Sequence, residues 1–328
     1  MRRTTRNWSL PLLAATVLAL AACGTTEPAA TPDAAAPTGE QITLTDARGQ
    51  QVVLDGPAER TVGLEWNVVE HLVSLGVMPV GVADVEGYGN WVQSAPLTGE
   101  VTDVGVRGEP SVESIAALDP DLVVATTDLP EAAVAQLETV APVLLVRSAD
   151  ATDPIGRMRA NVDLVAQATG TQDAAATLLA DFDAKLAEGA AAISAAGLEG
   201  RPMAFSDAYV DGGQLSIRPF TGGSLAGAVA AELGLPSAWT IEGDPDYGLA
   251  STDVEGLTAL GDVEYLYYDN AAVTPDPITE TLTGNAVWES LPFVRAGNVT
   301  RLPDGIWMFG GPASMQAYVD AVVAAVTG

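Results

Sequence analysis

The chain has 328 residues, 48% of them hydrophobic, and a formal net charge of −29 at pH 7. This length supports one large domain or two smaller ones, and the strong negative charge argues against binding to nucleic acid or anionic lipid head groups. With a single histidine, His71, and a single cysteine, Cys23, we expect no resident metal site built from these ligands.

The first 22 residues have the pattern of a secretory signal peptide. Three arginines lie within the first six residues, an apolar run spans residues 10–22, and Cys23 follows two alanines. The run is too short for a membrane span, which needs about 20 apolar residues. We therefore predict cleavage after residue 22 and lipid attachment at Cys23; an ordinary signal peptide that meets a cysteine by chance is the alternative.

The next segment, residues 23–40, combines the lipidated cysteine with a flexible linker. It is rich in Ala, Thr and Pro and holds almost no large apolar side chain, so it cannot form a core.

From residue 41 to about residue 150, short apolar runs alternate with helical patterns, which predicts an α/β lobe with parallel strands and crossover helices. The expected strands lie at 62–64, 80–82, 122–125 and 143–146, and the expected helices at 68–75, 112–118 and 131–140.

Residues 151–198 read as a helical connection. Asp153 and Pro154 have the pattern of a helix start, the pattern breaks near Gly170, and a helix of about 24 residues begins at Gln172. Such a helix is long enough to join two lobes.

A second α/β lobe is expected from residue 199 to residue 328. Its predicted strands lie at 203–206, 215–217, 265–268 and 299–302, and its predicted helices at 223–233, 252–260 and 313–326. The fold class is thus α/β, with two Rossmann-like lobes joined by one long helix.

Motifs for catalysis are weak, and we predict no catalytic residue. Residues 222–227 resemble the turn that carries the nucleophile of serine hydrolases, but Ala226 stands where that motif needs glycine. A glycine-rich turn that caps a helix after Ser224 explains the segment better, and His71 lies in an ordinary helical pattern. A secreted serine hydrolase that uses Ser224 is the distant alternative.

Aromatic residues point instead to binding. Trp66, Trp91 and Trp307 each follow a predicted strand or lie in a loop, and Arg107 precedes the helix expected at 112–118. Open α/β sheets bind ligands at the carboxyl ends of their strands. In a chain so poor in cations, an arginine there indicates an anionic or oxygen-rich ligand.

The order of the motifs resembles the substrate-binding lipoproteins of iron-siderophore ABC importers, and most closely the ferric-hydroxamate (ferrichrome) binding proteins. The motifs are 46–49 (DARG), 64–66 (LEW), 103–107 (DVGVR), 109–113 (EPSVE), 120–123 (PDLV), 235–239 (LPSAW), 291–297 (LPFVRAG) and 307–310 (WMFG). The resemblance implies the class III periplasmic binding protein fold, with a shallow ligand cleft between the lobes.

It also implies the residues that line the cleft: Trp66, Trp91, Arg107, Tyr247 and Trp307. Arg107 matches the family arginine that binds iron-bound hydroxamate oxygens, and we add Arg218, near the expected rim of the second lobe. Tyr247 stands where close relatives have tryptophan, and a further family tyrosine has no match in residues 125–129. Because ferric-citrate binders share the arginine, ferric citrate remains an alternative ligand, as do haem and cobalamin.

The resemblance assigns Glu113 and Glu255 to docking on the permease. Each has a structural explanation too, since Glu113 lies in a first helical turn and residues 252–255 read as a capping box. The expected protein is a monomer on the extracytoplasmic face of the cell membrane, held by its lipid. It has no cofactor and binds iron only within a ferric siderophore. A surface lipoprotein without a ligand is a further alternative.

Overall fold

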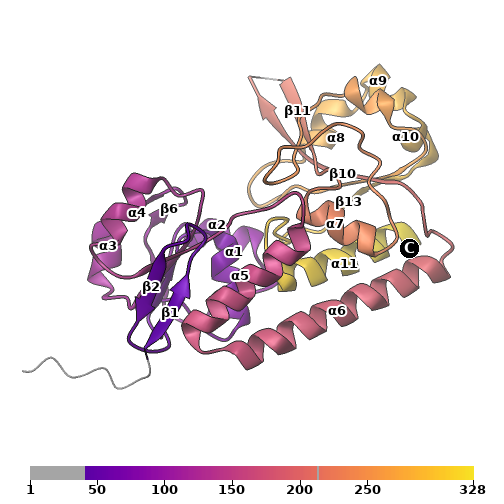
Figure 1. Ribbon diagram of the computed structural model, residues 1–328. Coiled ribbons are helices and arrows are strands. Elements are labelled where there is room, and N and C mark those ends of the chain that lie inside the picture. Colours follow the sequence, from indigo (N-terminus) through magenta and orange to yellow (C-terminus); the bar gives the residue numbers. More distant parts are fainter. Residues whose placement is uncertain (1–40, 213) are drawn as a thin grey trace, which may run out of the picture. The chain divides into compact units, whose positions relative to one another are not determined.

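The computed structural model describes residues 41–212 and 214–328, which contain two larger β-sheets, two helices that connect them and two separate two-stranded hairpins (Figure 1). The predicted signal peptide, Cys23 and the linker to residue 40 lie outside these residues. Within the described part of the chain, no helix is long and apolar enough to cross a membrane.

The N-terminal sheet is parallel and has the strand order β5-β4-β3-β8-β9. Its strands are β3 (Thr61–Gly63), β4 (Gly81–Val82), β5 (Thr102–Asp103), β8 (Leu122–Thr126) and β9 (Val143–Val146). Successive side chains of β8 point to opposite faces of the sheet, and all five residues of this strand are buried. This sheet is therefore covered on both sides, as its continuous apolar strands require.

Helices cover both faces of this sheet. Leu122 and Val124 pack on the side of α1 (Trp66–Ser74) and α5 (Pro154–Thr169). Val123 and Ala125 pack on the side of α3 (Val112–Ala117) and α4 (Glu131–Leu137). The remaining elements are α2 (Val85–Trp91) and the two antiparallel hairpins β1 (Ile42–Thr45)–β2 (Gln51–Leu54) and β6 (Gly105–Val106)–β7 (Glu109–Pro110).

The C-terminal sheet is mixed and has the order β11-β10-β12-β13. An antiparallel hairpin, β10 (Met203–Asp211) and β11 (Gln214–Pro219), is extended by the parallel strands β12 (Glu264–Tyr267) and β13 (Val299–Arg301). The helices of this half are α7 (Leu225–Glu232), α8 (Pro277–Leu282), α9 (Ala286–Ser290), α10 (Pro292–Ala296) and α11 (Pro312–Thr327).

The connection consists of α5 and α6 (Gln172–Ala195). Asp153 accepts a hydrogen bond from the Gly156 backbone N–H at the start of α5, and Gly170 ends this helix in a left-handed conformation. The 24 residues of α6 confirm the predicted long helix. Its first half packs with the core beneath β1 and β2, and its second half packs against α7 and α11 (Figure 1). Both cores thus share one rigid element.

Several expectations about local structure were wrong. Residues 252–260 form only a short 3₁₀ helix, Gly256–Ala259, because the Thr252 backbone pairs with Ile217 on β11 instead of starting a helix. The capping box is absent there too, since the Gly256 N–H is bound by the Asp253 carboxylate. Both α2 and the β1–β2 hairpin were missed.

The glycine-rich turn at residues 222–227 caps a helix, as expected. The Ser224 hydroxyl donates to the Thr221 carbonyl at 2.8 Å and accepts from the Gly227 N–H at 3.0 Å, which starts α7. Ser224 is buried, and within the described residues no hydrogen bond joins it to His71. These bonds account for Ser224 as a structural residue.

Candidate functional site

A cleft of about 540 Å³ is lined by all six residues that we predicted to contact a ligand. They come from the start of α1, the end of α2, the β6–β7 turn, β11, the loop before residue 250 and the loop that precedes α11: Trp66, Trp91, Arg107, Arg218, Tyr247 and Trp307. Two positions differ from expectation, because Trp66 begins α1 and Trp91 ends α2, whereas both were expected just past a strand or in a loop. Contact with a ligand stays a prediction for all six.

Trp66, Trp91, Trp307 and Phe309 form an aromatic wall of this cleft, and Trp307 contacts the other three. Its ring lies edge-on to Trp66 at 4.8 Å, to Phe309 at 5.0 Å and to Trp91 at 6.0 Å between centroids. Trp66 and Trp307 are almost fully buried, whereas Trp91 is half-buried and also contacts Tyr268. The wall is therefore a packed cluster, and its apolar surface suits the organic periphery of a ligand.

Arg107 lies over this wall. Its guanidinium carbon is 3.7 Å from the centre of the Trp66 ring, and its Nη1 donates to Glu65 Oε1 at 2.8 Å. The residue occupies the two-residue β6–β7 turn, where Gly108 has a φ of +83° that a side chain would strain. One ion pair and one stacked face leave the other nitrogens of Arg107, whose side chain is 34% exposed, free to donate to a ligand.

Arg218, in contrast, is bound to a carboxylate of the protein through two of its nitrogens. Its Nε and Nη2 both donate to the carboxylate of Asp207, its cross-strand partner in the β10–β11 hairpin. Burial raises the pKa of Asp207, and the guanidinium opposes that shift. The Arg218 charge is thus balanced by a neighbour, which the sequence alone did not indicate.

Tyr247 joins the two halves of the cleft. Its hydroxyl donates to Asp128, which follows β8 in the N-terminal half, and its ring packs edge-on against Phe309 at 5.6 Å. Burial raises the pKa of Tyr247, and the Asp128 carboxylate acts in the same direction. Asp128 lies in the segment where the family tyrosine was missing, and no signal in the sequence marked it as a cleft residue.

The two glutamates predicted to dock on a permease are both exposed and lie outside the cleft lining. Glu113 is in the first turn of α3, and Glu255 directly precedes the 3₁₀ helix. Cys23 lies outside the described residues, and residues 41–212 and 214–328 contain no group of His, Cys, Asp and Glu that could hold a metal ion.

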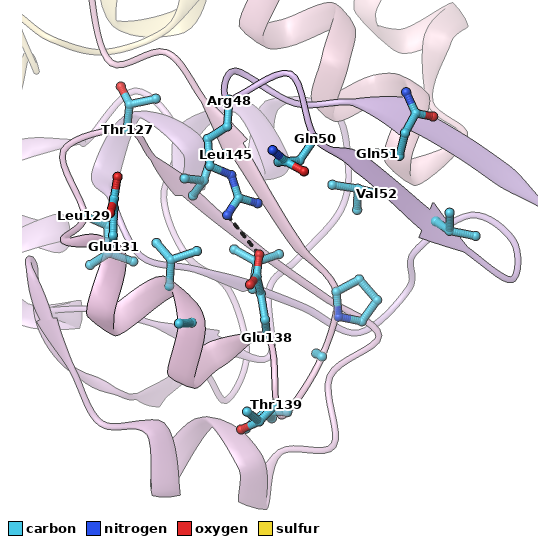
Figure 2. A pocket seen from close by; sticks show the side chains of 17 residues that line it. Arg48, Gln50, Gln51, Val52, Thr127, Leu129, Glu131, Glu138, Thr139 and Leu145 are labelled. Atoms are coloured by element: carbon cyan, nitrogen blue, oxygen red, sulfur yellow. Dashed lines mark hydrogen bonds and ion pairs between the residues drawn. The ribbon is translucent and has the colours of Figure 1, made fainter.

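A second hollow, of about 910 Å³, lies between the β1–β2 hairpin, α4 and β9 (Figure 2). Figure 2 shows the ion pair between Arg48 and Glu138, 2.9 Å long, that crosses it. The hollow has no aromatic side chain in its lining and shares no residue with the cleft. The cleft is the better candidate, because it unites aromatic surface with an available guanidinium.

The comparisons with known proteins agree with this geometry. The sequence model for the periplasmic binding protein family matches residues 62–305. The chain belongs to this family. It is 30% identical over 273 residues to the iron(3+)-hydroxamate-binding protein FhuD of Escherichia coli, covering 82% of this chain and 87% of FhuD.

Two further relatives align with this chain over nearly the whole of their own length. The probable siderophore-binding lipoprotein YfiY of Bacillus subtilis is 24% identical, with 92% of each chain covered. The crystal structure of the siderophore-binding protein FhuD from Vibrio cholerae, bound to Fe³⁺–Desferal, superposes with a TM-score of 0.72 at 25% identity, covering 82% of this chain and 98% of that one. The fold is that of the class III periplasmic binding proteins, as the sequence predicted.

Proposed function

We propose that this protein captures a ferric siderophore of the hydroxamate type outside the cell and delivers it to an ABC importer. Arg107 carries the proposal, because its stacked guanidinium offers donors beside an aromatic wall in an open cleft. Iron-bound hydroxamate oxygens carry partial negative charge, which charge-assisted hydrogen bonds from a guanidinium stabilise. The aromatic side chains cover the rest of the complex without requiring hydrogen bonds.

The relatives support the same ligand class. FhuD of Escherichia coli is named for iron(3+)-hydroxamate, and YfiY of Bacillus subtilis is named a lipoprotein. Together with the leader pattern that ends at Cys23, this supports a binding protein held by lipid on the extracytoplasmic face of the membrane. Glu113 and Glu255, both exposed, are the docking residues in this proposal.

Tryptophan fluorescence titration of the purified protein tests the proposal, because Trp66, Trp91 and Trp307 all line the cleft. The panel contains ferrioxamine B, ferrichrome, ferric citrate, a ferric catecholate, haem and cobalamin. We expect saturable quenching by a ferric hydroxamate and a weaker response to its iron-free form. Saturable quenching by ferric citrate, the ferric catecholate, haem or cobalamin alone would replace the hydroxamate assignment, and no response to any ligand would refute the siderophore function.

A further inference from the structure

The charges in the cleft carry information about the ligand that the aromatic wall does not. Four carboxylates line it and only two guanidinium groups: Glu65, Asp128, Asp207 and Asp269 against Arg107 and Arg218. Asp269 is paired with Arg301, which is not a lining residue, so the uncompensated charge of the lining is that of Asp128, in a chain whose net charge is already −29. A strongly anionic iron complex would meet repulsion from this surface.

The ion pairs of the lining residues show which charge has no partner. Arg218 is held by Asp207, and Arg107 is paired with Glu65, so each guanidinium already has a carboxylate partner. Asp128 has no cationic partner within the described residues, and it accepts only the neutral hydroxyl of Tyr247. Its second oxygen is free to accept from a ligand at the exposed edge of the cleft.

Asp269 gives an independent sign of a missing partner. This residue lines the cleft but is only 6% exposed, and its Oδ1 is bound by Arg301, whereas its Oδ2 has no hydrogen-bond partner. Burial raises the pKa of Asp269, and Arg301 opposes that shift. A buried carboxylate oxygen without a donor is unfavourable, and a donor from a ligand would relieve that cost.

We infer that the cleft selects a ferric complex with a cationic side arm, recognised through Asp128 and Asp269 while Arg107 binds the iron-bound oxygens. This inference rests on the proposed function. Three hydroxamate groups neutralise ferric iron, so a trihydroxamate with one free amine is a cation, and the same complex with that amine acetylated is neutral. Ferric citrate and ferric catecholates are anionic, and they are the complexes that this lining excludes.

The test compares ferrioxamine B, which has a free amine, with its N-acetylated form by fluorescence titration at low and high salt. We expect the cationic complex to bind about two- to fivefold more tightly at low ionic strength, with the ratio falling toward one at high salt because salt screens such contacts. Equal affinities at low salt would refute the charge selection and leave the proposed function intact. Failure of both complexes and of ferrichrome to bind would refute the proposed function itself.

Three variants locate the effect. Asp128→Asn keeps the shape of the side chain but removes its charge, and we expect it to lower the ratio between the two affinities because only the free amine needs that charge. Glu131→Gln removes the same charge from an exposed residue outside the cleft lining and should leave the ratio as it is. Asp269→Asn should also lower the ratio if it folds. An unchanged ratio in Asp128→Asn, or an equal fall in Glu131→Gln, would refute the assigned contact.

Discussion

The buried imidazole of His71 makes the stability of this protein depend on pH in a way that one substitution should remove. His71 lies on α1 and is 1% exposed, packed so closely to the loop before α11 that a Cβ on Gly311 would come within 2.6 Å of its Nδ1. Its Nδ1 has no hydrogen-bond partner. Burial without compensation lowers the pKa of His71 to about 4, against about 6.5 in an unfolded chain.

The direction of this pH dependence is set by which state of the protein, folded or unfolded, binds the proton. Between pH 6.5 and about 4 the unfolded chain protonates this histidine and the folded chain does not, so the free energy of unfolding falls as the pH is lowered. The two pKa values correspond to a loss of about 2 kcal/mol at pH 5 relative to pH 7. The buried carboxylates Glu70 and Asp207, whose pKa values burial raises, act in the opposite direction over this range. The dependence of the free energy of unfolding on pH therefore contains contributions from several groups.

His71→Leu isolates the contribution of the imidazole. His71 is the only histidine in the chain, and replacing it with an apolar side chain of similar size loses no hydrogen bond at Nδ1. We expect the variant to match the wild type within about 1 kcal/mol at pH 7 and to be about 2 kcal/mol more stable than it at pH 5. Urea unfolding followed by tryptophan fluorescence at both pH values measures this. An identical loss of stability in the two proteins would show that His71 is protonated in the folded state or accessible to water.

Three further outcomes are expected. Glu70→Ala should lower the free energy of unfolding in urea by about 3 kcal/mol, because the buried carboxylate of Glu70 accepts from the Ser314 N–H and hydroxyl at the start of α11. Ser314→Ala should lower it by only about 1 kcal/mol, and equal losses in the two variants would count against this capping role. Arg107→Ala should weaken binding of a ferric hydroxamate by about 1.5–3 kcal/mol in fluorescence titration, and an unchanged affinity would remove it from the site. Glu113→Ala with Glu255→Ala should leave binding intact and reduce uptake of the labelled iron complex by cells; normal uptake would exclude both from docking.

The sequence predicted best what depends on local pattern. The long helix α6 was expected from its regular apolar face, and it begins two residues after Gly170, where the pattern breaks. The alternation of strands and helices likewise indicated both sheets. Short elements were missed for a physical reason: α2 has two glycines in seven residues and begins after Asp84, a non-glycine residue at φ +58°. Helix propensity is low in such a segment, and the tertiary contacts of Tyr88 and Trp91 hold it instead.

Charge pairing is the part of the site that sequence reasoning could not reach. Arg218 looked like a second cation for the ligand, but the register of the β10–β11 hairpin places it directly opposite Asp207. Asp128 and Tyr247 are 119 residues apart, so no local pattern links them. Pairings of this kind depend on which strands are neighbours and in which register, and a single shifted residue would undo them.

These pairings change which ligands the cleft can be expected to hold. From the sequence, the net negative charge disfavours a highly anionic ligand such as ferric citrate unless Arg107 and Arg218 together create a local positive field. In the structure Arg218 donates from two of its nitrogens to Asp207 and Arg107 donates from one to Glu65, so Arg107 keeps the larger number of free donors for a ligand. One available guanidinium on an aromatic wall suits a neutral iron core, because a neutral core needs directed hydrogen bonds more than net positive charge. The acidic remainder of the lining then acts on the arms of the ligand, where cationic and neutral siderophores differ.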